Sequence, residues 1–498
     1  MVDQSTMMLS VIVLLSLFLL VRLYLTRNFR YWKKKHVPHS RPTALFGTIF
    51  PVLTQKRSIS QYLHDVYKMA DSFCMGFFIF DKPALLAKDP DLVRSILMSD
   101  FVHFEDRNIA DNKEHDILSA VSLLMLKNPE WSEARSRFTS TLSAGKVKAM
   151  FEMVVSAAEG FVEHVRNVSL LEDVTECREL SIKYSIDAIA SYAFGIQANS
   201  FQNSEFYKLS RNLQNSSISR VIHSVCYFFA HRFVKPFRMT FLEPSSVKFL
   251  TEIFQNNVKM RRKMETKRVD LVHSLITMDG KVDNYDIYTH GLAISLEYMT
   301  AGFISSATTL SFTLYDLCVN PVIQARLRNE IRTVLTNHGT LSYQAVRNMD
   351  YLDMCVKESL RMHPILGFLD RRCTKTYQIP NTDIVIDKGV PVYVSLYGLH
   401  NDPKYFPDPE KYNPERFAPE NKERLERFAF LPFGEGRRNC IGINFAYLIV
   451  KMAVLQLLLN FEIVPSSRTP QKITLESSGF ITIPKHEEIN VHFQKLPE

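Results

Sequence analysis

Residues 433–442 read FGEGRRNCIG, and the apolar run INFAYLIVKMAVLQLLLNF follows directly at 443–461. The run has the length and composition of a buried helix of about 18 residues, so Cys440 stands at a helix entrance. There the unpaired backbone N–H groups and the positive end of the helix dipole favour a thiolate over a thiol. The flanking glycines also let the backbone approach a flat ligand closely. The stretch therefore predicts that Cys440 is a thiolate able to ligate iron.

Most lone cysteines are buried and chemically inert, so this prediction needs support from the surrounding residues. The stretch matches the pattern F-x-x-G-x-R-x-C-x-G at Phe433, Gly436, Arg438, Cys440 and Gly442. In these positions the sequence resembles the cysteine loop of the cytochrome P450 family. The resemblance implies haem b as the cofactor, Cys440 as its iron ligand, and Phe433, Arg438 and Gly442 as cofactor-binding residues.

Two further stretches resemble the parts of that family that contact the haem propionates. Trp131 and Arg135 lie one helical turn apart in WSEAR, and Arg371 lies in LDRRC at 369–373. Arginine suits carboxylates because its planar fork forms charge-assisted, bidentate hydrogen bonds. Each arginine could otherwise be a solvated surface residue. The resemblance implies that Trp131, Arg135 and Arg371 bind the cofactor.

A third group of matches implies a structural network. Glu358 and Arg361 are spaced i and i+3 in KESLR, on one helix face before Pro364. E-x-x-R alone is a weak signal, but Arg416 follows in NPERF, and in the family these three side chains form a buried network. One carboxylate between two guanidiniums can satisfy many donors in a core. We expect Glu358, Arg361 and Arg416 to have structural roles.

Residues 288–320 form an apolar-rich stretch that predicts one long helix. At its centre, MTAGFISSATTL at 299–310 resembles the family pattern A-G-x-[DE]-T-[TS], in which Gly302 would leave room for dioxygen. The acid and the hydroxyl of that pattern supply protons, yet here Ile304 stands at the acid position and Ser305 at the threonine position. A serine hydroxyl still donates and accepts hydrogen bonds. We therefore assign catalytic roles to Ser305 and Ser306.

This departure leaves alternatives open. The first function is a haem-thiolate monooxygenase that inserts one oxygen atom from O2 into a lipophilic xenobiotic, hormone or lipid. Its electrons would come from an NADPH-dependent cytochrome P450 reductase, with cytochrome b5 as a further donor. The second is a reductase-independent isomerase or dehydratase of hydroperoxides. The third is a haem-binding protein with weak or no catalysis. Ile304 is the residue that keeps the second and third open.

A membrane segment is predicted at the N-terminal end. Residues 7–25 read MMLSVIVLLSLFLLVRLYL, which is long enough to cross a bilayer about 30 Å thick. A cleaved signal peptide is the alternative, but no Lys or Arg precedes the run and no A-x-A-like site follows it. Arg27, Arg30 and the run 33–35 come next, so the positive-inside rule places the remaining chain in the cytosol. We expect a single anchor in the endoplasmic reticulum membrane.

Composition sets the overall class. The chain has 498 residues, 46% of them hydrophobic and 22% charged, which is typical of a globular protein. Its formal charge of +8 is scattered, so it indicates membrane and partner contacts rather than nucleic acid. Seven cysteines without a C-x-x-C pair argue against a disulfide framework and against a structural zinc site.

The expected fold is mainly α with a small β portion, that is, a cytochrome P450 fold preceded by one N-terminal transmembrane helix. We expect an anchor at 1–26, a basic and proline-containing connector at 27–50, and one catalytic domain at 51–498. Short β-like runs stand at about 371–400 and 460–498, and the stretch at about 55–370 is mostly helical in periodicity. Phrases such as FVHFEDR at 101–107 resemble the insect microsomal branch, which is rich in detoxification enzymes.

Overall fold

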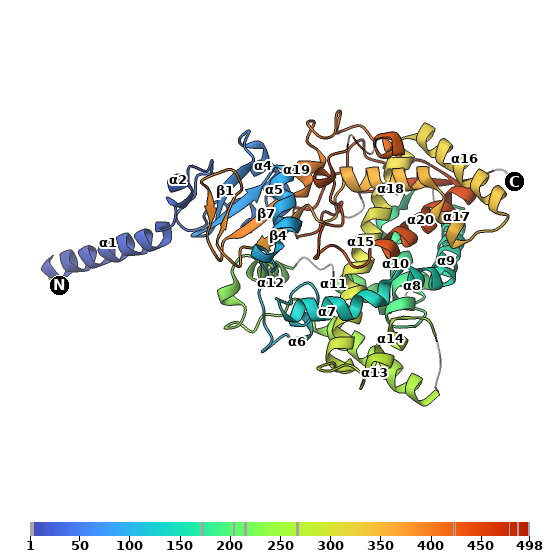
Figure 1. Cartoon of the computed structure of the whole chain (residues 1–498), viewed down its shortest axis with the longest axis horizontal. Coiled ribbons are helices and arrows are strands. Elements are labelled where there is room, and N and C mark those ends of the chain that lie inside the picture. The colour runs from blue at the N-terminus through green and yellow to red at the C-terminus, as the bar shows by residue number, and fades with distance from the viewer. Residues whose placement is uncertain are drawn as a thin grey trace. The chain divides into compact units, whose positions relative to one another are not determined.

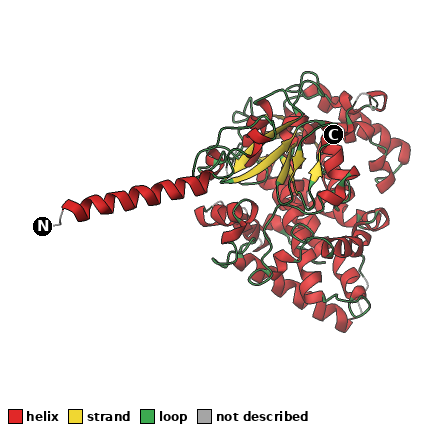
Figure 2. Cartoon of the chain, turned by 60° about the vertical axis from the view of Figure 1, so that its left-hand side comes forward, coloured by secondary structure: helices red, strands yellow, loops and turns green. Residues whose placement is uncertain are grey.

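The computed structural model describes residues 4–170, 174–202, 205–213, 217–264, 268–421, 423, 425–477, 479–485 and 488–496 (Figure 1). The chain divides into two compact units. The first comprises the residues up to Asn108 together with Gly367–Leu399, and the second comprises Ile109–Leu366 together with the residues from His400 onward. Most of the described chain is helical and the strands are few, as predicted (Figure 2).

The first unit is built on a four-stranded sheet in the order β1-β2-β7-β4. β1 pairs with β2 and β4 with β7 in antiparallel fashion, whereas β2 and β7 are parallel. The sheet strands are β1 (Cys74–Ile79), β2 (Lys82–Ala87), β4 (Phe368–Arg372) and β7 (Pro391–Ser395), and β5 (Tyr377–Gln378) pairs with β6 (Val385–Ile386). The helices are α1 (Gln4–Thr26), α2 (Tyr31–Lys34), α3 (Phe50–Leu53), α4 (Ile59–Lys68), α5 (Pro90–Arg94) and α19 (Leu396–His400), with a π-helical turn η1 (Ser95–Ser99) and a 3-10 turn η2 (Phe101–His103).

Two of these strands were not predicted. β1 and β2 lie inside the stretch whose periodicity predicts mostly helix. All six residues of β1 are buried, so its sequence CMGFFI shows no alternation of apolar and polar residues. A short apolar run without alternation cannot be distinguished from a buried helical segment by periodicity alone. The strands near 371–400 and 460–498 agree with the prediction.

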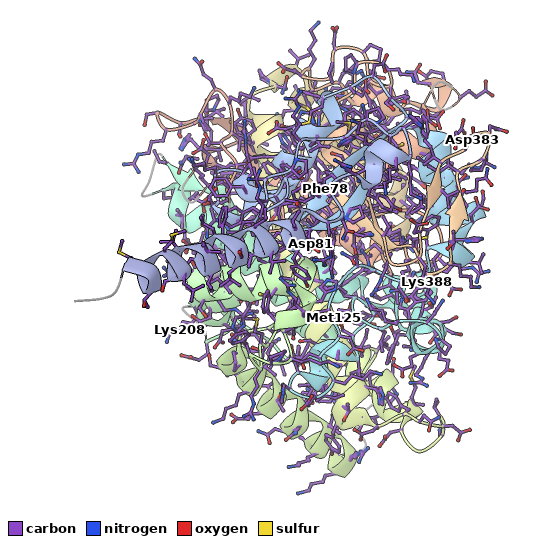
Figure 3. The ribbon with its side chains drawn as sticks, turned by 90° about the vertical axis from the view of Figure 1, so that its left-hand side faces the viewer. Phe78, Asp81, Met125, Lys208, Asp383 and Lys388 are labelled. Carbon is purple, nitrogen blue, oxygen red and sulfur yellow. The ribbon has the colours of Figure 1, made fainter. Side chains whose placement is uncertain are left out.

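Helix α1 extends from the sheet of the first unit, and its apolar side chains are exposed. From Thr6 to Thr26 it is long and apolar enough to cross a membrane, and none of this span is buried. Its end is fixed by Arg27, which pairs with Asp81 at 2.5 Å, and by Phe29, whose ring centroid lies 5.3 Å from that of Phe78. Figure 3 labels Phe78 and Asp81 at the base of this helix. The predicted N-terminal transmembrane helix therefore has the required length and composition.

The second unit is a helical assembly with a three-stranded antiparallel sheet in the order β3-β9-β8. Its strands are β3 (Thr175–Glu176), β8 (Phe461–Pro465) and β9 (Asn490–Lys495). Its helices are α6 (Ile117–Ala120), α7 (Glu130–Thr139), α8 (Ala144–Ala149), α9 (Phe151–Ser169), α10 (Cys177–Ala193), α11 (Glu205–Leu213), α12 (Ile218–Phe228), α13 (Pro244–Met264), α14 (Leu271–Met278), α15 (Leu292–Cys318), α16 (Pro321–His338), α17 (Tyr343–Arg347), α18 (Asp350–Met362) and α20 (Ile443–Asn460). Short turns complete it at η3 (Ser140–Leu142), η4 (Ser200–Gln202), η5 (His231–Phe233), η6 (Ile287–Gly291), η7 (Pro414–Phe417), η8 (Pro419–Asn421) and η9 (Arg427–Ala429).

Two core helices of this unit carry the predicted site motifs. α15 has 27 residues and spans about 40 Å. It is shorter than the predicted helix at 288–320, because a π-helical turn, η6, precedes it. α20 has 18 residues and follows Cys440 as predicted. α20 is also long and apolar enough to cross a membrane, but 56% of it is buried inside the unit, as expected of a core helix.

Candidate active site

Cys440 lies at the end of a tight loop that leads into α20. Gly434 and Gly436 have φ angles of 68° and 77°, a conformation that glycine adopts without strain. The Cys440 N–H donates to the carbonyl of Phe433 at 2.9 Å, which closes the loop. The Gly442 N–H donates to the Cys440 Sγ at 3.3 Å. A backbone N–H directed at the sulfur, at the start of a helix, stabilises negative charge there. The loop geometry therefore suits a thiolate.

Exposure separates Cys440 from the other six cysteines, all of which are buried. Burial raises the pKa of Cys74 and of Cys318 to about 12 and that of Cys373 to about 11. These three groups therefore remain protonated thiols at neutral pH. Cys440 is the cysteine that a metal can reach.

Helix α7 contributes two of the predicted cofactor residues, and both lie against the cysteine loop. Arg135 donates from Nη1 to the Asn439 carbonyl and from Nη2 to the Asn439 Oδ1, both at 2.8 Å. The Arg438 guanidinium lies 4.1 Å from the ring centroid of Trp131, and its Nη2 donates to the Leu126 carbonyl at 2.9 Å. Trp131 and Arg438 are both buried. The structure thus brings Trp131, Arg135 and Arg438 together.

Arg371 lies on β4 in the first unit, and it is almost completely buried. Its Nη1 donates to the Asp370 carbonyl at 2.8 Å, but its buried Nε has no hydrogen-bond partner among the described residues. Burial, and then the neighbouring Arg107 charge, lower the pKa of Arg371 to about 9. A buried guanidinium in this state is suited to an anionic ligand, because a carboxylate would accept the free N–H and offset the desolvation. This donor fits a cofactor that carries carboxylates, as haem does.

The centre of α15 is accessible on one face. Ala301 is exposed and Ile304 and Ser305 are half-buried, whereas Phe303 and Ser306 are buried. Residues spaced by three and four share one helix face, which accounts for this stripe. Ser305 and Ser306 therefore do not lie together, because the structure places Ser306 on the buried side. The position of the family's acid belongs to the accessible face and carries Ile304.

The Ser305 hydroxyl donates back into its own helix, to the Ala301 carbonyl at 2.7 Å and the Gly302 carbonyl at 3.3 Å. Gly302 itself has a packing role, because a Cβ there would lie 3.1 Å from the Ile189 Cδ1 of α10. Its missing side chain therefore brings α15 close to α10, whereas the sequence pattern predicts room for dioxygen. The accessible face thus carries the Ser305 hydroxyl beside Ile304, and the half-buried Thr300 hydroxyl likewise donates within its own helix, to the Leu296 carbonyl at 2.8 Å.

The three residues of the predicted structural network are in contact. Arg361 donates from Nε to the Glu358 Oε2 at 2.8 Å and from Nη2 to the Glu358 Oε1 at 2.9 Å, and Arg416 Nε donates to the same Oε1 at 3.2 Å. Glu358 and Arg361 are completely buried. The Asn413 N–H also donates to Glu358, at 3.0 Å. The network therefore joins α18 to η7 and to Asn413, the residue before it.

His400 extends this network toward the cysteine loop, and the sequence gives no sign of it. Arg361 donates to its carbonyl at 2.9 Å, and its Nε2 accepts the Leu431 N–H at 2.9 Å. The Leu431 carbonyl in turn accepts the Gly434 N–H at 2.9 Å. Burial, followed by the Arg361 charge, lowers the pKa of His400 to about 3, so the ring stays neutral and can accept. A lone histidine in the segment YGLHNDP carries no recognisable pattern.

Two residues of α15 before its centre were also not predicted. Burial raises the pKa of Tyr298, and its hydroxyl lies 3.0 Å from the Thr141 hydroxyl. Glu297 accepts the N–H groups of Leu123 and Leu124 at 2.8 and 3.0 Å. A glutamate in an apolar helix could have been noticed, but the backbone groups that it binds are distant in sequence.

Comparisons with known proteins show the family of this chain. The family model described as Cytochrome P450 matches residues 37–491, beginning inside the predicted connector. The chain is 36% identical to "Cytochrome P450 6k1" of Blattella germanica over 95% of its own length and 94% of that protein. It is 34% identical to "Probable cytochrome P450 6d4" of Drosophila melanogaster, over 96% of both chains. Both relatives are insect proteins, as the resemblance implies. The chain belongs to the cytochrome P450 family and is a haem-dependent monooxygenase of the oxidoreductase class.

Proposed function

We propose that this enzyme is a membrane-anchored monooxygenase that inserts one oxygen atom from O2 into lipophilic small molecules, with Cys440 as the thiolate ligand of haem b. The observation that carries the proposal is the cysteine loop. Cys440 is exposed at the start of α20, and its sulfur accepts the Gly442 N–H. Haem bound there supplies dioxygen activation, and the thiolate favours O–O cleavage.

The residues that would hold the haem are those of the predicted set. In the second unit, Arg135 and Arg438 supply two guanidiniums beside the cysteine loop, and the Trp131 ring fixes Arg438. In the first unit, Arg371 supplies a buried guanidinium with a free Nε. Each of these guanidiniums has the donor geometry that a carboxylate such as a haem propionate accepts. Phe433 and Gly442 would shape the loop around the sulfur.

Proton supply is the step for which this chain departs from its family. Ile304 cannot hold a proton, whereas the half-buried Ser305 hydroxyl next to it can accept one from water and pass it on. Its hydroxyl now donates to the Ala301 carbonyl, and it can rotate to donate into the accessible side instead. We assign the relay to Ser305 and a supporting packing role to Ser306. Supply through one hydroxyl is slower than through an acid and a hydroxyl together.

A second candidate function follows from the same departure. An isomerase or dehydratase of hydroperoxides uses a substrate that already contains the O–O bond, so it needs neither external electrons nor a proton relay for dioxygen. Ile304 on the accessible face of α15 favours this candidate. The hydroxyl of Ser305 favours the monooxygenase.

The setting that we propose is the endoplasmic reticulum membrane, with 1–26 as the anchor, 27–50 as the connector and 51–498 facing the cytosol as the catalytic domain. The exposed apolar α1 and the basic residues that follow it support this topology. The partners would be an NADPH-dependent cytochrome P450 reductase and cytochrome b5. We infer no nucleic-acid partner.

The test reconstitutes the full chain with haem, lipid and an NADPH-dependent cytochrome P450 reductase, with 7-ethoxycoumarin as a lipophilic probe. We expect NADPH consumption that rises with the probe, together with the dealkylated product. A parallel reaction receives cumene hydroperoxide and neither NADPH nor reductase. Rearrangement of the hydroperoxide, without any NADPH-driven product, would establish the second candidate and overturn the first.

A further inference from the structure

The sequence of α15 contains two carboxylates, Glu297 and Asp316, and their surroundings differ. Asp316 is buried near the end of the helix, where it accepts the Ser359 hydroxyl at 2.7 Å. Glu297 is half-buried. It precedes Ala301 by four residues and Ser305 by eight, so it lies on the same helix face as both. Glu297 is thus the carboxylate of α15 that shares the accessible face.

Glu297 binds a segment of the chain that is distant in sequence. Its Oε2 accepts the Leu123 N–H at 2.8 Å, and its Oε1 accepts the Leu124 N–H at 3.0 Å. Both carboxylate oxygens therefore take part in one two-pronged contact. Hydrogen bonds from backbone N–H groups to a charged carboxylate are stronger than neutral ones, and they favour the ionised form. This contact fixes the direction of two consecutive peptide groups.

The same segment is held a second time, at its other end. Arg438 of the cysteine loop donates to the Leu126 carbonyl at 2.9 Å. Residues 123–126 are thereby tied to the oxygen-activating helix at one end and to the loop of Cys440 at the other. Leu123, Met125 and Leu126 are buried, whereas Leu124 is half-buried. Figure 3 labels Met125, which marks this segment in the ribbon.

We propose that Glu297 is a positioning residue that holds residues 123–126 as a wall of the substrate cavity and so sets which ligands fit beside the iron. Its carboxylate is joined to the face of α15 that carries Ala301 and Ser305. A segment clamped to that face borders the space in which the substrate reacts. The proposal rests on haem binding at this site, and it assigns Glu297 no contact with the reacting atoms.

The chain provides a matched control in Glu330 on α16. Glu330 accepts the N–H groups of Tyr351 and Leu352 at 2.7 and 2.9 Å, so it makes the same kind of two-pronged contact with another backbone segment. Substitution of Glu330 removes an equivalent interaction without altering the accessible face of α15. Any effect shared by both substitutions is therefore a general loss of stability.

The variants are Glu297→Gln, which keeps the shape but leaves one N–H facing an amide NH2 group, and Glu297→Asp, which keeps the charge on a shorter side chain. Glu330→Gln is the control. Loss of one charge-assisted bond speeds local amide exchange by about tenfold. We expect this increase at Leu123 and Leu124 in Glu297→Gln, and at Tyr351 and Leu352 alone in Glu330→Gln. Glu297→Asp should restore most of the protection.

The second readout is ligand selectivity of the haem-loaded full chain. Imidazole and 4-phenylimidazole both bind haem iron and differ in bulk, so the ratio of their dissociation constants reports the space beside the iron. We expect Glu297→Gln to change this ratio at least about threefold, and Glu330→Gln to leave it unchanged, because only the first contact fixes the wall.

The two readouts separate the possible failures. Unchanged exchange at Leu123 and Leu124 in Glu297→Gln would overturn the clamp itself. Faster exchange with an unchanged ratio would show that residues 123–126 do not border the ligand, and the proposal would also be wrong. If the unsubstituted chain bound haem without a thiolate spectrum, the proposed function would fail, while the exchange measurement would still report on the clamp. If Glu297→Gln did not fold, Glu297→Met, which fills similar space without an acceptor, would take its place in both measurements, with the same expected and contradicting results.

Discussion

Two polar regions of the second unit are organised in opposite ways. In the network around Glu358, the local pair of Glu358 and Arg361 is joined to distant parts of the chain, since Arg361 reaches the His400 carbonyl and Arg416 reaches the Glu358 carboxylate. On the accessible face of α15, the hydroxyls bond within their own helix, as when Ser305 donates to Ala301. The Glu358 network matches the family pattern in full, whereas the accessible face of α15 carries Ile304 at the position of the family's acid. Polar groups that bond only locally can change without disturbing the fold, and groups that join distant segments cannot.

The largest effect should come from removing the carboxylate at the centre of the Glu358 network. Glu358→Ala leaves the buried Arg361 guanidinium and the half-buried Arg416 guanidinium without their carboxylate, and breaking a buried pair in this way costs about 3–5 kcal/mol. We expect a chain that does not retain haem and unfolds at a markedly lower temperature, as measured by thermal denaturation. Lys208→Ala, which breaks the exposed pair with Glu205, is the control and should change little. Normal haem retention in Glu358→Ala would contradict the structural role of the network.

Substitutions on the accessible face of α15 should change the enzyme's activity rather than its stability. Ser305→Ala removes the accessible hydroxyl, and we expect the product formed per NADPH to fall by about tenfold or more. Ile304→Asp restores an acid on the same face and should raise this coupling. The control is Ser311→Ala, because the Ser311 hydroxyl makes the same kind of bond, to the Ala307 carbonyl, on the buried part of α15. Equal coupling in all variants would exclude Ser305 from proton supply.

The pH dependence of stability should come from His400, which extends the Glu358 network. Burial and the Arg361 charge lower the pKa of His400 to about 3, so the folded state keeps it neutral while the unfolded state binds a proton below about 6.5. Stability is therefore lost as the pH falls from about 6.5 toward 3, by about 2 kcal/mol between pH 6.5 and 5. Thermal denaturation of the haem-loaded chain at these pH values measures the loss.

His400→Gln keeps a hydrogen-bond acceptor and removes this titration, so its denaturation temperature should fall less over the same interval. Burial lowers the pKa of His64 to about 4, so the stability of both chains still depends on pH to a smaller extent. If the two chains lost stability in parallel, protonation of His400 would not be responsible.

The smallest effect should come from Arg371, whose buried Nε has no partner among the described residues. Arg371→Met removes a desolvated charge, so we expect no loss of stability in the haem-free chain. The same substitution removes a donor for a propionate, and haem affinity should fall by about tenfold, since a hydrogen bond to a charged group contributes about 1.5–3 kcal/mol. Haem titration and denaturation of the haem-free chain measure the two effects. If Arg371→Met lowered both the haem affinity and the stability of the haem-free chain, the role of Arg371 would be structural.

The sequence predicts those parts of the molecule whose residues follow local rules. The helix after Cys440 and the spacing of Glu358 and Arg361 depend on apolar periodicity and on one helical turn, and both are found as predicted. The strands β1 and β2 were not predicted, because a completely buried strand shows no alternation.

Contacts between distant segments set the limit of sequence-based prediction. The bond from Leu431 to His400 and the bonds from Leu123 and Leu124 to Glu297 join residues that no local pattern relates. The exposure of Ser305 and the burial of Ser306 likewise follow from how α15 packs. Identifying a motif therefore did not decide which of its two hydroxyls is accessible.

Thiolate ligation by Cys440 is tested most directly by the ferrous–carbon monoxide difference spectrum of the full chain, compared with Cys440→Ala and with the control Cys226→Ala. We predict the red-shifted Soret band of a thiolate complex in the unsubstituted chain and in Cys226→Ala, and its absence in Cys440→Ala. A thiolate band that persists in Cys440→Ala, or that is absent from the unsubstituted chain when haem is bound, would contradict the assignment of Cys440 as the iron ligand.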